Sequence, residues 1–137
     1  MAFADGQSNA VIYYGESEAR VVLVGTVTRG DAVGYSSGWK RALATVAGVV
    51  QMRCTAAEDG VSGDTVRVYF GKCIVGGARY SGATAGGAVY VAEGTSNGMY
   101  TQALPDTTGD STKIVGYALD ATTLVLTPNA NVDSVKS

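Results

Sequence analysis

The sequence predicts an all-β protein, and three features of the chain support that prediction. Short runs rich in Val, Tyr, Thr and Ile recur along the 137 residues, separated by clusters of Gly, Ser, Asp or Asn. The 19 glycines are spread among these runs instead of forming a tract of their own. Two segments repeat the same order of turns and strands. We therefore expect a small β-sandwich or β-barrel (β-tulip-like) made of two related short-strand units, with little or no helix.

Eight expected strands are short apolar or alternating runs that end at turn residues. In chain order they span residues 10–14, 19–27, 32–35, 49–55, 65–70, 89–91, 113–119 and 123–127. Residues 39–46 fit either a short helix or the return strand of a hairpin, because eight residues are marginal for an isolated helix.

The two units cover approximately residues 28–75 and 84–127, and each reads turn, strand, hairpin, return strand, acidic bend, strand. Three pairs of segments match: 30–33 with 86–89, 39–42 with 100–103, and 65–68 with 123–126. Strands this short are not stable as isolated hairpins, so the units must share a core. The large side chains expected in it are Trp39, Phe70, Tyr90, Tyr100, Tyr117, Leu119, Leu124 and Leu126.

The chain divides into three parts. Residues 1–15 form either an N-terminal arm that adds a strand to a neighbour or an ordinary edge strand, residues 16–127 form the β domain, and the polar residues 128–137 form a flexible C-terminal tail. The first residues lack the basic and apolar regions of a secretory signal, and no apolar run is long enough to span a membrane. We expect synthesis in the cytoplasm and no membrane partner.

The composition excludes several classes of function. The formal net charge is −2 and no basic run is present, which argues against a nucleic-acid partner. The chain has no histidine, so Ser-His-Asp and Cys-His catalysis are absent, and we expect no enzymatic activity. The two cysteines, Cys54 and Cys73, could pair, but in a reducing compartment we expect small core residues. We expect no cofactor.

Motif-like features are better explained by structure than by chemistry. The scattered carboxylates lack the dense spacing of a calcium loop, and the adjacent Glu58 and Asp59 would point to opposite faces of a strand. Residues 82–87 are Gly-rich but lack the Lys-Ser/Thr ending of a phosphate-binding loop. The integrin-type triplet, residues 29–31, is expected to form a turn.

Residues 30–128 resemble the small decoration (cement) and head-fibre proteins of tailed bacteriophages. The resemblance rests on the Gly-Asp turns before apolar strands, on Trp or Tyr followed by Ala on the return strand, and on residues 86–91 leading to 114–119. It implies a β-rich structural virion protein, often a homotrimer, that binds the outside of an assembled capsid and stabilises it by bridging copies of the major capsid protein.

Under this hypothesis the contacts with the capsid come from residues 3–14 and from the loop at residues 80–87. The side chains expected at the interface are Phe3, Val11, Ile12, Tyr13, Tyr14, Tyr80 and Thr84. The alternative is a tail or fibre module, or a carbohydrate- or receptor-binding β module, which would use an exposed platform of Trp39 and tyrosines.

Overall fold

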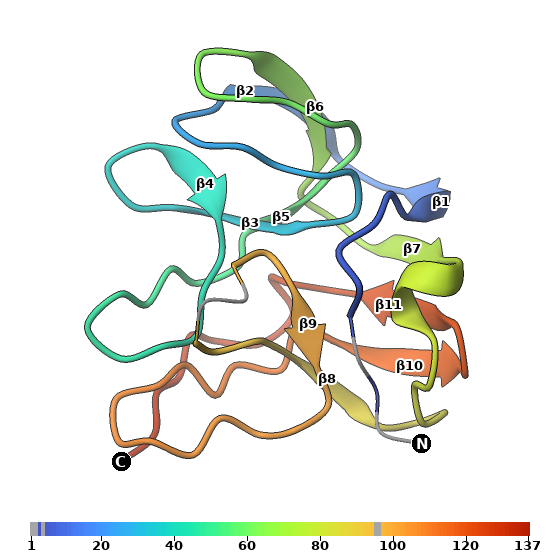
Figure 1. Ribbon diagram of the computed structural model, residues 1–137, viewed down its shortest axis with the longest axis vertical. Helices are drawn as coiled ribbons and strands as arrows, with labels where there is room; N and C mark the ends of the chain where they lie inside the picture. The colour runs from blue at the N-terminus through green and yellow to red at the C-terminus, as the bar shows by residue number, and fades with distance from the viewer. Residues whose placement is uncertain (1–2, 4, 95–96) are drawn as a thin grey trace.

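The computed structural model, which describes residue 3 and residues 5–94 and 97–137, is a β-sandwich of two antiparallel sheets that are not closed into a barrel (Figure 1). The five-stranded sheet has the order β2 (Glu18–Val22), β6 (Thr65–Tyr69), β5 (Cys54–Ala56), β3 (Ala32–Tyr35) and β4 (Trp39–Arg41). The six-stranded sheet has the order β1 (Val11–Gly15), β7 (Cys73–Gly76), β11 (Thr123–Leu126), β10 (Gly116–Asp120), β8 (Ala88–Val91) and β9 (Tyr100–Thr101). The helical content of the described residues is one 3₁₀ turn, η1 (Ala78–Tyr80).

The two sheets repeat one topology. If β2–β6 are counted as strands one to five of the first sheet and β7–β11 as strands one to five of the second, both sheets have the order first, fifth, fourth, second, third. The second sheet carries β1 as an additional strand at one edge. The register agrees, because Val33 lies opposite Cys54 as Val89 lies opposite Gly116. The chain is therefore built from two related units, and their strands span residues 18–69 and 73–126.

The residue-level match between the units differs in part from the sequence-based one. The strand registers agree with the sequence match of residues 30–33 to residues 86–89, because Val33 and Val89 occupy equivalent positions in the two sheets. Further along, Val68 lies opposite Ala56 and Leu124 lies opposite Ala118, so Val68 corresponds to Leu124. The sequence match had paired Val66 with Leu124, because short runs of alternating residues align equally well when they are shifted by two.

Two strand pairs pass from one sheet to the other and couple them. β1 continues into β2 and β6 into β7, and the two segments stay paired across the bend, where the amide of Glu16 donates to the Lys72 carbonyl at 2.9 Å. Ser17 adopts a positive φ of 58° at this bend. A side chain at Gly71 would lie 2.8 Å from the Glu16 Cβ, so the close approach of the two segments requires glycine there.

Two buried clusters hold the fold together. The larger lies between the sheets and includes Val75, Val89, Leu124 and Leu126 from one sheet and Ala32 from the other. The smaller covers the opposite face of the five-stranded sheet and consists of Val21, Leu23, Val27, Val33, Cys54, Ala56, Val66 and Val68. Each large apolar side chain contributes about 1.5–3 kcal/mol when fully buried.

The cysteines occupy different clusters, Cys73 between the sheets and Cys54 in the smaller one. Both are free and buried, as expected for small core residues, and burial raises the pKa of each thiol to about 12.

Several strand expectations are corrected. Residues 39–46 contain the return strand β4 and not a helix, and the expected strand at 49–55 is reduced to β5, preceded by an isolated bridge between Leu43 and Val50. The strand β7 was not expected. Tyr117 and Leu119, expected in the core, are exposed because Ala118 takes the inward position between them.

The N-terminal segment is an intramolecular edge strand preceded by a docked arm. The guanidinium of Arg79 is completely buried and pairs with the carboxylates of Asp5 and Asp31, each at 2.8 Å. Tyr80 and Tyr100 lie edge to face beside it, and the Arg79 guanidinium carbon is 5.2 Å and 5.9 Å from their ring centroids. This buried cluster, called here the arm latch, fixes the segment that leads into β1.

The arm latch also explains the triplet at residues 29–31. The Asp31 carboxylate has no exposed surface, pairs with Arg41 at 2.7 Å as well as with Arg79, and accepts the amide hydrogen of Thr28. It cannot reach a receptor, so the turn interpretation holds and the adhesion interpretation is wrong.

The C-terminal residues, expected as a flexible tail, make ion pairs and hydrogen bonds with the rest of the chain. The Asp133 carboxylate pairs with both Arg53 and the buried Lys113, and the hydrogen bonds from Arg53 lower the pKa of Asp133. The Asn129 amide donates to the carbonyls of Arg53 and Phe70 at 2.9 Å. The tail is polar because it is held by charges and hydrogen bonds, a pattern that sequence alone does not distinguish from disorder.

Candidate interaction surface

The outer face of the six-stranded sheet is unusually apolar. Side chains alternate along each strand, so Val75, Val89 and Leu124 point inward while Ile74, Ala88 and Val125 point outward and are partly exposed. The register aligns one outward row across five strands, which runs Tyr14, Ile74, Val125, Tyr117 and Ala88. A solvated antiparallel sheet would carry polar side chains in such a row.

A β-bulge in β1 adds a second tyrosine to this face. The register of β1 and β7 shifts between Ile12 and Tyr14. The ring of Tyr13 then lies over Gly76, where an added Cβ would be 2.6 Å from Tyr13 Cε2. Tyr13 is 61% exposed and Tyr14 is 46% exposed, so the bulge presents two neighbouring aromatic rings.

We call the apolar and aromatic members of the outward set the apolar sheet face; they are Val11, Tyr13, Tyr14, Ile74, Ala88, Tyr90, Tyr117, Leu119 and Val125. The alternation also turns the paired Gly76 and Thr123 to this side of the sheet. The five most exposed members leave on the order of 600 Å² accessible, the upper end of the largest apolar patch on ordinary monomers. Patches of this size commonly mark interaction sites.

Charged groups lie at the margins of the apolar sheet face. The Lys72 ammonium lies over the Tyr14 ring, 5.5 Å from its centroid, and the Tyr14 hydroxyl donates to Glu16 at 2.6 Å. This hydrogen bond lowers the pKa of Glu16 and raises that of Tyr14. At the other end Asp120 caps its own turn by accepting the amide hydrogen of Thr122. An apolar centre with a polar margin is the usual composition of a protein interface.

The duplicated topology provides an internal precedent for covering this face. By the shared register, Ala32 and Thr55 in the five-stranded sheet correspond to Ala88 and Tyr117. Ala32 and Thr55 are completely buried, and Ala32 belongs to the cluster between the sheets. One unit therefore packs this face against another sheet, while the other unit leaves it exposed.

The structure distributes the seven expected interface residues unevenly. Val11, Tyr13 and Tyr14 lie on the apolar sheet face. Thr84 is exposed and lies in the loop before β8. This loop donates backbone hydrogen bonds to the carbonyls of Ala118 in β10 and Ala121 in the next turn, so it lies at one edge of the apolar sheet face.

The other three expected residues do not lie on the apolar sheet face. Ile12 and Phe3 are partly buried and pack against the cluster between the sheets. Tyr80 has no exposed surface, and its hydroxyl donates to the Gly30 carbonyl, so it is withdrawn from the interface set. It was assigned there because a tyrosine in a Gly-rich segment resembles a surface residue, whereas here it packs beside the buried arginine of the arm latch.

Sequence reasoning missed most of the apolar sheet face. Tyr90, Tyr117 and Leu119 were expected in the core, and Ile74 and Val125 were not singled out. The alternation of Tyr117, Ala118 and Leu119 shows which residues share a face, but it cannot show which face is solvated when both are apolar.

The aromatic platform required by the carbohydrate alternative has an unfavourable geometry. Tyr35 is exposed and packs edge to face on Trp39 with ring centroids 5.3 Å apart, and Trp39 packs in the same way on Phe70 at 5.5 Å. Trp39 is partly buried against the smaller cluster. The rings therefore do not form a flat stacking surface.

The carboxylates that sequence analysis weighed as metal ligands make structural hydrogen bonds. Asp64 accepts the Val61 amide hydrogen, Asp110 accepts that of Val46, and Asp59 accepts that of Arg29. Across residues 3, 5–94 and 97–137, no group of three Cys, Asp or Glu side chains could hold a metal ion. Within the same residues, no helix is long and apolar enough to cross a membrane.

Comparisons with protein-family models, with curated proteins and with solved structures found no match to this chain.

Proposed function

We propose that the chain is a non-enzymatic structural protein that binds another protein through the apolar sheet face. The observation that carries this proposal is the outward row that crosses five neighbouring strands with apolar or aromatic side chains alone: Tyr14, Ile74, Val125, Tyr117 and Ala88. Leaving such a face in water costs the protein solubility, and covering it stabilises the complex in proportion to the apolar area removed.

The partner that the sequence resemblance implies is the major capsid protein on the outside of an assembled phage shell. Tyr13, Tyr14 and Thr84, expected at this contact from the sequence, lie on or beside the apolar sheet face. A contact of about 800 Å² per partner is typical of a specific interface, and the five most exposed residues of the apolar sheet face supply on the order of 600 Å². Repeated over the shell, as a homotrimer or as single copies, it would bridge capsid subunits and oppose the internal pressure of packaged DNA.

The proposal is tested by sedimentation of the purified protein with and without undecorated capsids of its own phage. Saturable co-pelleting at a fixed ratio to the major capsid protein is the expected result. The sedimentation coefficient of the protein alone reports whether it is a trimer. Absence of co-pelleting would contradict the capsid role, and the alternative of a fibre or receptor-binding module would then be tested next.

A further inference from the structure

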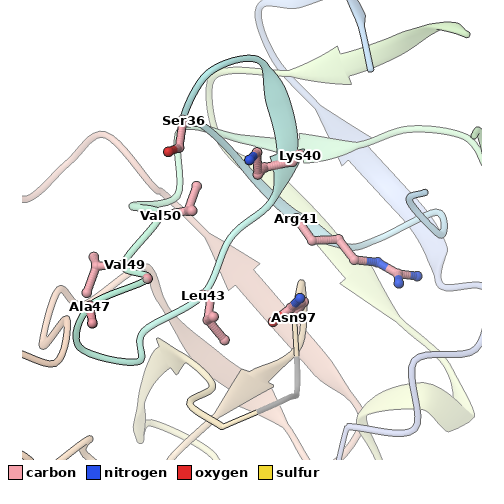
Figure 2. Close-up of a pocket in the computed structure, with 9 residues that line it drawn as sticks. Ser36, Lys40, Arg41, Leu43, Ala47, Val49, Val50 and Asn97 are labelled. Atoms are coloured by element: carbon pink, nitrogen blue, oxygen red, sulfur yellow. The ribbon is translucent and has the colours of Figure 1, made fainter. Parts of the chain in front are cut away.

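A concave site lies away from the apolar sheet face and shares no residue with it. It is a cavity of about 580 Å³ bordered by the β3–β4 hairpin, the loop that follows β4, and Asn97 from the second unit (Figure 2). This volume falls within the range of about 300–1,000 Å³ that is usual for small-ligand pockets.

One wall of the cavity is aliphatic. Leu43, Ala47, Val49 and Val50 line it, and none of the lining residues that the structure describes is aromatic. Ala47 is held at a positive φ of 71°, a conformation that costs an L-residue free energy and that is found preferentially at binding loops. The bridge between Leu43 and Val50 fixes the two ends of this loop.

The opposite side carries one uncompensated positive charge. The Lys40 ammonium makes no salt bridge or hydrogen bond with the described part of the chain, whereas Arg41 pairs with Asp31 at 2.7 Å and donates to Thr28. Figure 2 shows the Arg41 guanidinium directed away from the other lining side chains. Among the described residues no acidic side chain lines the cavity, and Ser36 and Asn97 add a hydroxyl and an amide.

From this arrangement we infer that the cavity binds a carboxylate that carries an aliphatic group, the chemistry of a chain terminus ending in an apolar residue. Lys40 pairs with the carboxylate, Ser36 or Asn97 donates a hydrogen bond to it, and the aliphatic wall buries the side group. A phosphate would require more cationic donors than one lysine, and a sugar would lack an aromatic surface for stacking. The site does not depend on the proposed function.

The test is an NMR titration of the ¹⁵N-labelled full chain with N-acetyl-L-leucine and, separately, with its neutral amide. The acid is expected to shift the amide signals of Leu43, Gly48 and Asn97 saturably, and the neutral amide to bind at least about fivefold more weakly. Titration with hexanoate shows whether the natural ligand is a chain terminus or a free aliphatic acid. Weaker binding of hexanoate than of N-acetyl-leucine supports a chain terminus, and tighter binding would show that the site prefers a free aliphatic acid.

Two variants separate this site from general surface charge. Lys40→Gln is expected to weaken binding of the acid about fivefold, while the matched variant Lys72→Gln, which removes a lysine beside the apolar sheet face, leaves it unchanged. Equal responses to the acid and the amide, an unaffected Lys40→Gln variant, or shifts confined to other residues would each overturn the inference.

Discussion

The arm latch makes a quantitative prediction about stability. In Asp5→Ala, the buried guanidinium of Arg79 loses one of its two carboxylate partners, with bonds of 2.8 and 3.2 Å, and keeps Asp31. The amide hydrogens of Gln7 and Tyr100, which Asp5 also accepts, lose their partner. Breaking a buried ion pair from one side costs about 3–5 kcal/mol. We expect a loss in this range because Arg79 must then share its one remaining carboxylate, Asp31, with Arg41, and the two amide hydrogens also lose their acceptor.

The assay is urea unfolding at neutral pH, followed by Trp39 fluorescence. The expected loss of about 3–5 kcal/mol corresponds to a fall in Tm of roughly 10–20 °C for a chain of this size. The matched control is Glu18→Ala, which removes an exposed partner of Arg67 at 3.5 Å and should cost less than about 1 kcal/mol. If Asp5→Ala loses no more than this control, the arm is not held by the latch and the reasoning fails.

Three further predictions concern the tail, the thiols and the register. Asp133→Asn should lower the free energy of unfolding by about 1 kcal/mol at pH 7. Because the folded pKa of Asp133 is lowered, this difference from wild type should persist above about pH 4 and shrink as the pH falls further. A difference that does not change with pH would contradict this. Cys54 and Cys73 should resist a thiol reagent at pH 8 and both react in urea, whereas rapid labelling of the native protein would contradict their burial. Leu124→Ala should cost about 2–5 kcal/mol in urea unfolding and Leu119→Ala less than about 1, and the reverse order would refute the assigned faces.

The sequence allowed the fold class and the duplication to be predicted, because both depend on local patterns. Short β-branched runs between Gly-containing turns define strands, and the match of 30–33 with 86–89 survives in the strand registers. The strand β7 was not predicted, although strands as short as residues 89–91 were. Its apolar run, Cys73 to Val75, shows no alternation of apolar and polar residues and lies between Lys72 and two glycines.

The candidate interaction surface was predictable only in part, because its location depends on which face of the sheet is buried. Tyr13 and Tyr14 were singled out as surface aromatics, but Tyr117 looks like a core residue in a sequence where both faces of the strand are apolar. Contacts between distant residues, such as Asp5 with Arg79 or Asp133 with Arg53, left no signal in the spacing of a single sequence.

The most direct test of the central claim, that the apolar sheet face is the binding surface, compares two variants in the co-pelleting assay with capsids. Tyr117→Ser combined with Leu119→Ser removes exposed apolar side chains from that face, and Tyr35→Ser removes an even more exposed tyrosine from the other sheet. With both variants folded by circular dichroism, the account predicts at least about tenfold weaker binding for the first and wild-type binding for the second. Unchanged binding of the double variant, or an equal loss with Tyr35→Ser, would contradict it.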